Sequence, residues 1–302
     1  GGTAMMRILG IVGVQVCICV PIIVFQFCKG KEFFSKEYWG YALRIGIPIV
    51  PHYLSGIILN QGDRIMIDKM VGKTEVALYG LAYSIGMLVQ LFISGMNSAL
   101  TPWMYSKIKK GDIRSMRKVL QLLSIVVVGI AVALMLISPE LVLIFGSPKY
   151  REAGYVPPVA ASVFFIFIYN ILSMPQFYYE KTQFLMAASM AAAGANVVLN
   201  FIFIRLFGYI AAGYTTLACY MLYSVGHYIV SKQILVNEGI QENLMNPGFL
   251  LACSVFLIGA SIICNLIFPY RILRYAILLA SAGLVFWKKE LLLKTMADIR
   301  KK

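Results

Sequence analysis

Four polar residues interrupt an apolar stretch of the chain, SGIILNQGDRIMIDKMVG at 55–72: Asn60, Gln61, Asp63 and Arg64. A charge at the middle of a bilayer costs about 2.5–3.5 kcal/mol, so such a residue usually faces a cavity and has a role. The planar guanidinium of an arginine suits phosphate or carboxylate. Two interpretations stay open: a polar face toward a cavity, or an internal salt bridge between Asp63 and Arg64.

The polar positions of this stretch share one side of a helix. His52, Asn60, Asp63 and Arg64 fall within about 120° on a helical wheel, and a second stripe over 79–101 falls within about 60°. A single such residue usually forms an interhelical hydrogen bond worth about 0.6 kcal/mol. Aligned stripes on five apolar stretches instead predict a shared, water-filled cavity. Its predicted lining is His52, Asn60, Asp63, Arg64, Tyr79, Tyr83, Gln90, Ser94, Asn97, Gln176, Asn196, Asn200, Tyr220 and Tyr223.

The elements that carry these stripes are membrane-spanning helices. Apolar residues make up 60% of the chain and charged residues 13%, against about 25% charged in soluble domains. The apolar windows are close to the length of about 20 residues that crosses a bilayer as helix, and they lack the alternation of barrel strands. The fold class predicted is all-α, a polytopic transmembrane bundle of about nine spans. The expected spans are 8–28, 41–70, 75–105, 117–138, 155–179, 183–206, 209–234, 249–268 and 271–291.

The excess of basic residues predicts topology. In a soluble protein a net charge of +14 would suggest nucleic acid. Here 18 of the 27 Lys and Arg lie in alternate loops and the C-terminal tail, so that side is expected to be cytoplasmic and to face anionic lipid headgroups. The prediction is a multi-pass protein with a cytoplasmic C-terminus and no nucleic-acid partner.

Catalytic motifs are missing from the sequence. It contains no Walker A, GxSxG or HExxH pattern, and its histidines and cysteines keep no metal-ligand spacing. Paired acids and bases on an extended loop, as a membrane glycosyltransferase would need, are also missing. The sequence therefore predicts a protein that is not an enzyme, with no catalytic residue, metal site or cofactor.

Two stretches resemble bacterial oligosaccharide flippases of the polysaccharide-transporter family. They are YWGYALRIGIPIVPHYLSGIILNQGDRIMIDKMVGKTEVALYGLAYSIGMLVQLFISGMNSALTPWMYSKIKKGD at 38–112 and GANVVLNFIFIRLFGYIAAGYTTLACY at 194–220. That family belongs to a superfamily with multidrug extruders and the lipid II flippase, and its fold is two six-helix lobes, often with two extra helices.

The resemblance implies a domain layout for this chain. The last helix of a first lobe would occupy 1–28, a cytoplasmic amphipathic linker 29–40, a second lobe 41–235, and two extra helices with a basic tail 236–302. About five spans of the first lobe would then be missing upstream, so an N-terminally truncated chain is expected.

The resemblance also implies an activity: translocation of polyprenyl-pyrophosphate-linked oligosaccharides across the bacterial cytoplasmic (inner) membrane, for O-antigen, capsule or exopolysaccharide. Arg64 would meet a pyrophosphate or acidic sugar. Asp63 would pair with Arg64 or bind a coupling cation, H⁺ or Na⁺, and the cavity tyrosines would offer faces to sugar rings. A polysaccharide polymerase is a further partner to consider. Two alternatives stay open: a multidrug, organic-cation antiporter of the same fold, which would favour an acidic, aromatic cavity, and a non-transporting membrane scaffold.

Overall fold

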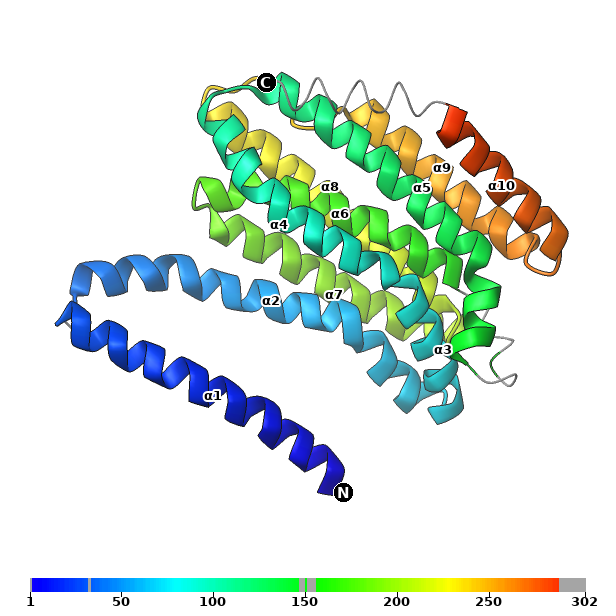
Figure 1. The fold of residues 1–302 in the computed structure, drawn as a ribbon, viewed down its shortest axis with the longest axis horizontal. Helices are drawn as coiled ribbons and strands as arrows, with labels where there is room; N and C mark the ends of the chain where they lie inside the picture. The colour runs from blue at the N-terminus through cyan, green and yellow to red at the C-terminus, as the bar shows by residue number, and fades with distance from the viewer. Residues whose placement is uncertain (1, 32–33, 147–149, 151–155, 288–302) are drawn as a thin grey trace. The chain divides into compact units, whose positions relative to one another are not determined.

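The computed structural model describes residues 2–31, 34–146, 150 and 156–287. The described residues form ten α-helices and no strand, which confirms the predicted all-α bundle (Figure 1). The helices are α1 (Gly2–Gly30), α2 (Lys36–Met70), α3 (Lys73–Gly86), α4 (Leu88–Lys109), α5 (Ile113–Phe145), α6 (Val156–Tyr178), α7 (Thr182–Phe207), α8 (Ala211–Asn237), α9 (Pro247–Leu266) and α10 (Arg271–Trp287). The basic tail at 288–302 lies outside the described residues.

Within the part of the chain that the structure describes, seven stretches are long and apolar enough to cross a membrane. Two further helices, α8 and α10, fall short of that criterion, although the sequence predicts a span at each. The polar face of α8 carries several tyrosines and a histidine, which lowers its hydropathy, and the described part of α10 has 17 residues. The seven stretches are Met5–Gly30, Lys36–Met70, Lys73–Lys109, Ile113–Phe145, Val156–Tyr178, Thr182–Phe207 and Pro247–Leu266.

The predicted span 75–105 is broken in the structure. Its two parts, α3 and α4, meet at Met87. Gly86, the last residue of α3, packs so closely on α6 that an added Cβ would lie 2.7 Å from Val159 Cγ1 and 3.2 Å from the Ala160 backbone nitrogen. A side chain at this position would keep the two helices apart, so the glycine permits the close approach.

The chain divides into two compact units, Gly1–Ile47 and Pro48–Lys302, with the boundary inside α2. The first unit holds α1 and the start of α2. The second unit is organised around α6, which packs against α3, α4, α5 and α8 (Figure 1). Phe164 and Phe167 of α6 are fully buried. The domain boundaries predicted at 28, 40 and 235 stay a prediction.

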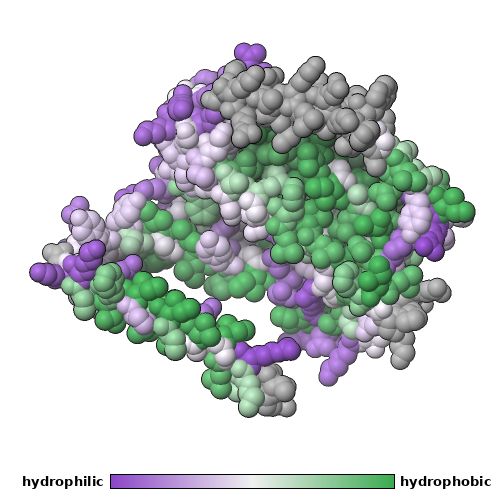
Figure 2. Space-filling model, viewed as in Figure 1, coloured by the Kyte–Doolittle hydropathy of each residue, from purple (hydrophilic) through white to green (hydrophobic). Residues whose placement is uncertain are grey.

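The second unit exposes many apolar side chains and buries several polar ones beside its apolar core. On α7, Asn196 and Asn200 are fully buried, whereas Val198 is 56% exposed. On α8, His227 is fully buried and Ile229 is 58% exposed. Figure 2 shows hydrophobic residues over the middle of the helices and hydrophilic residues toward their ends. This arrangement suits a protein whose surroundings are lipid.

Candidate functional site: a polar cavity beside α2

An open cavity of about 700 Å³ lies within the second unit. Its walls come from α2, α3, α4, α6 and α8 and the Met87 junction, and they combine aromatic rings with amide and hydroxyl groups. None of the lining residues is Asp, Glu, Lys or Arg. The lining is His52, Tyr53, Gly56, Ile57, Asn60, Gln61, Tyr83, Met87, Gln90, Tyr169, Asn170, Ser173, Phe177 and Tyr223.

Asn60 ties α2 to two other helices. Its Oδ1 accepts hydrogen bonds from the Tyr83 hydroxyl of α3 at 2.8 Å and the Tyr220 hydroxyl of α8 at 3.1 Å. Its Nδ2 donates to the Gly56 carbonyl at 2.7 Å. The amide is therefore held in one orientation at the cavity wall, and both tyrosines act here through their hydroxyl groups.

Asp63 lies one turn further along α2 and is fully buried. Its Oδ2 accepts hydrogen bonds from the hydroxyls of Tyr79 and Thr216, the latter at 3.4 Å. Its Oδ1 accepts from the Arg64 backbone N–H at 2.8 Å. Three donors from α2, α3 and α8 thus surround one carboxylate. Charge-assisted hydrogen bonds of this kind are the stronger ones in proteins.

The guanidinium of Arg64 contacts neighbours other than that carboxylate. Its guanidinium donates to Gln61 Oε1 at 3.2 Å, and its Cζ lies 4.8 Å from the centre of the Tyr83 ring. No side-chain ion pair joins Asp63 and Arg64 in the described part of the chain. The salt bridge considered from the sequence is therefore not formed. Arg64 instead contacts Gln61 and Tyr83, two residues that line the cavity.

A further group of polar contacts, around His52, joins α2 to α7 and α8. His52 Nδ1 lies 2.5 Å from Ser189 Oγ and 3.2 Å from the Tyr223 hydroxyl, and the latter two oxygens are 2.7 Å apart. The Tyr169 ring of α6 packs 4.4 Å from the Tyr223 ring, centre to centre. His227 packs 4.5 Å from the same ring. The two histidines of the chain, separated by 175 positions in sequence (227 minus 52), therefore share one cluster.

The structure brings only some of the predicted lining residues to this cavity. Five of the fourteen line it directly: His52, Asn60, Tyr83, Gln90 and Tyr223. Four more do not line the cavity but form hydrogen bonds or ring contacts with lining residues or with one another: Asp63, Arg64, Tyr79 and Tyr220. A direct substrate role for these four stays a prediction.

The other five predicted residues lie elsewhere. Asn200 Nδ2 donates to Asn196 Oδ1 at 3.1 Å inside α7. Gln176 Nε2 lies 2.8 Å from His227 Nδ1 between α6 and α8. Ser94 and Asn97 lie on α4, outside the set of lining residues.

Sequence reasoning left several lining residues out of its candidate set. Tyr53 and Phe177 sit in apolar runs, and their rings lie 5.4 Å and 6.2 Å from that of His52. Asn170 and Tyr169 come from α6, the most deeply buried span. Tyr169 lies on the same face of the predicted span 155–179 as Ser173 and Gln176 and could have been found from that polar stripe, whereas Tyr53 and Phe177 carry no such signal.

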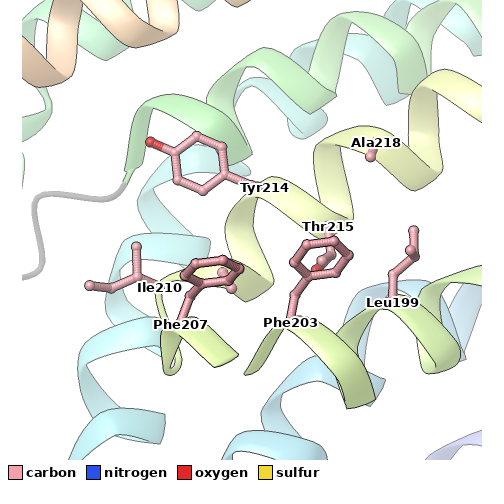
Figure 3. A pocket seen from close by; sticks show the side chains of 8 residues that line it. Leu199, Phe203, Phe207, Ile210, Tyr214, Thr215 and Ala218 are labelled. Carbon is pink, nitrogen blue, oxygen red and sulfur yellow. The ribbon is translucent and has the colours of Figure 1, made fainter. Parts of the chain in front are cut away.

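A second groove, of about 530 Å³, lies between α7 and α8 near the turn that joins them (Figure 3). Its walls are almost wholly apolar, and Figure 3 shows the rings of Phe203, Phe207 and Tyr214 around it. Thr215 is its one small polar lining residue, and its hydroxyl donates to Asn200. Such walls cannot replace the hydration of a polar ligand, so the cavity beside α2 is the better candidate site.

Comparison with known proteins finds one family model and two bacterial proteins that are similar to parts of this chain. Residues 4–108 match the sequence model of a family described as "Polysaccharide biosynthesis protein". Two Haemophilus influenzae proteins are similar. "Lsg locus putative protein 1" is 28% identical over 171 residues, 53% of this chain and 41% of that protein. An "Uncharacterized membrane protein" is 28% identical over 191 residues, 59% of this chain and 46% of that protein.

These matches confirm the resemblance to the polysaccharide-transporter family, with the family match itself ending at residue 108. The chain spans less than half the length of the curated relatives it matches. No solved structure matches it significantly.

Proposed function

From this family resemblance, we propose that the chain belongs to a transporter that flips polyprenyl-pyrophosphate-linked oligosaccharides across the bacterial cytoplasmic membrane for cell-surface polysaccharide synthesis. The observation that carries the proposal is the 700 Å³ cavity, lined by amides, hydroxyls and rings, inside a bundle with an apolar exterior. Sugars need hydrogen-bond partners in place of water as they cross, whereas a prenyl tail can stay in the lipid.

The cavity lining matches the chemistry of a sugar. Asn60, Gln61, Gln90 and Asn170 supply both donors and acceptors for hydroxyl and acetamido groups. Aromatic rings such as Tyr169 offer apolar faces to the C–H side of a pyranose. Pockets that combine aromatic walls with a few fixed polar groups are typical ligand sites.

Arg64 is proposed to attract the pyrophosphate or an acidic sugar at the border of this cavity. Its guanidinium is already oriented by Gln61 and Tyr83, so little side-chain freedom is lost when it binds an anion. Asp63 is proposed to serve the coupling cation, H⁺ or Na⁺, because it is the buried carboxylate that joins α2, α3 and α8. Exchange between inward and outward states would follow from one group of helices rocking against another.

An organic-cation antiporter is the main alternative. Such a transporter would be expected to expose a carboxylate to its ligand, but the cavity lining holds none, and Asp63 is enclosed by three donors. The lining therefore lacks the carboxylate that an organic cation would need, and Arg64 beside it suits an anionic glycolipid. A membrane scaffold would need no such cavity.

Deletion of the gene encoding this chain tests the proposal. Surface polysaccharide should be lost, and the lipid-linked oligosaccharide should accumulate on the cytoplasmic leaflet, where a membrane-impermeant label added to inverted vesicles reaches it. The intact gene should restore export, and Asn60→Leu should not. Normal export in the deletion strain, or sensitivity to organic cations with normal polysaccharide, would reject the proposal in favour of the scaffold or the antiporter.

A further inference from the structure

His52 is placed where one ring nitrogen is held by the protein and the other faces the cavity. Nδ1 makes both hydrogen-bond contacts of the side chain, to Ser189 and Tyr223. The residue lines the cavity and is half-buried, and Nε2 has no partner among the described residues. The other histidine differs, because His227 Nε2 is enclosed and without a partner.

The contacts of Ser189 favour a hydrogen on Nδ1 of His52. Ser189 donates its one hydroxyl hydrogen to the Leu185 carbonyl at 2.7 Å. Its oxygen can then accept from both neighbours, the Tyr223 hydroxyl at 2.7 Å and His52 Nδ1 at 2.5 Å. We assign the hydrogen to Nδ1 on this pattern. In a neutral imidazole this leaves the lone pair on Nε2, the atom open to the cavity.

No charged side chain among the described residues contacts His52. The titratable neighbours are Tyr53 on its own helix, Tyr169 on α6, and Tyr223 and His227 on α8. The α7 contact, Ser189, does not titrate. A proton taken up on Nε2 would turn the cavity face of His52 into a cation with an N–H donor, and it would leave the Nδ1 contacts in place.

A second basic residue lies further along α2. His52 and Arg64 are twelve residues apart on one helix, a rise of about 18 Å, and the lining between them has no charged residue. We propose, building on the flippase function above, that protonated His52 binds an anionic group of the glycolipid, a phosphate or a sugar carboxylate, through Nε2–H. The helix would then offer two anion contacts, one at each end of the cavity wall.

Binding to the purified chain in nanodiscs tests this assignment. The probes are geranyl diphosphate, glucuronate and glucose, each titrated at about pH 5.5 and about pH 8, which bracket the range where histidine usually titrates. At least one of the two anions should bind about tenfold more tightly at the lower pH, since a charge-assisted hydrogen bond is gained. Glucose should show no such difference. The anion that responds names the source of the charge.

Three variants and one control distinguish a role of His52 Nε2 in anion binding from the structural contacts of Nδ1. His52→Asn keeps an amide N–H near the Nδ1 position and should lose the pH dependence, and His52→Gln provides the same test with a longer side chain. Ser189→Ala removes the structural contact and should keep the pH dependence. His227→Asn is the matched control and should also keep it.

The inference is overturned if neither anion responds to pH, or if both His52 variants respond as the wild type does. Anion binding can prove independent of pH while glycolipid export still depends on the gene. Anion binding can also prove pH-dependent through His52 while export does not depend on the gene. Failure of the inference is therefore distinguishable from failure of the proposed function.

Discussion

Different forces hold α6 and the part of α2 that belongs to the second unit, from Pro48 onward. In its most apolar window α6 is 89% buried and α2 is 17% buried. Close packing fixes α6, as the contacts of Gly86 with Val159 and Ala160 show. Hydrogen bonds at His52, Asn60 and Asp63 fix α2. Packed contacts resist small shifts, whereas hydroxyl and amide partners can be exchanged for water or sugar, so the comparison points to α2 as the ligand-facing wall.

The largest effect is expected in the packed region. Phe164→Ala should lower the free energy of unfolding by about 3 kcal/mol, the lower end for buried phenylalanines, because lipid is as apolar as the core and the loss is mainly of packing. Thermal unfolding of the purified protein in detergent measures this. Phe92→Ala on α4 is the control, because that ring is 48% exposed. Equal losses for both variants would contradict the assigned core.

The contact between α3 and α6 gives the next effect. Gly86→Ala should cost about 1–3 kcal/mol, since its Cβ would overlap Val159 and approach the α6 backbone. Gly80→Ala on the same helix meets nothing within 4 Å and should be neutral or slightly stabilising. The same unfolding measurement compares the pair. A stable Gly86→Ala protein would show that the helices are less closely packed than described.

The polar region should show its effect in export. Arg64→Lys should reduce surface polysaccharide severalfold, because a point charge replaces a planar fork. The double variant Asp63→Asn with Arg64→Gln should not restore what either single change removes, since no side-chain ion pair joins the two residues among the described contacts. Recovery of export by the double variant would show that the two charges only neutralise one another.

The smallest effect concerns a single hydrogen bond of α2. Tyr220→Phe removes one of two donors to Asn60 and should cost about 0.6 kcal/mol of stability, the average for an interhelical hydrogen bond in a membrane protein. Thermal unfolding of Tyr220→Phe beside the wild type measures the loss. A cost as large as that of Phe164→Ala would remove the distinction between the two regions.

Periodicity predicted which faces of the helices are polar and that they turn inward. Asn60, Tyr83 and Tyr223 reach the cavity as their stripes indicate. A helical wheel gives the face of one helix, but it does not give the partner opposite that face. Asn200 therefore pairs with Asn196 and with Thr215, and neither asparagine lines the cavity.

The sequence also did not predict the break at Met87 or the contact between His52 and Ser189. The break depends on how closely α6 approaches Gly86, which is a tertiary contact. The His52 cluster joins α2 to helices more than a hundred residues away. Local propensity and hydropathy carry no information on either.

We propose above that the cavity wall formed by α2 takes part in carrying a lipid-linked oligosaccharide across the bilayer. The most direct measurement is its translocation in vesicles reconstituted with the protein that the gene produces, followed by digestion of outer-leaflet substrate with a membrane-impermeant glycosidase. The account predicts rapid transfer with the wild type and with Phe92→Ala, and transfer near the protein-free rate with Asn60→Leu. Transfer by Asn60→Leu at the wild-type rate would contradict it.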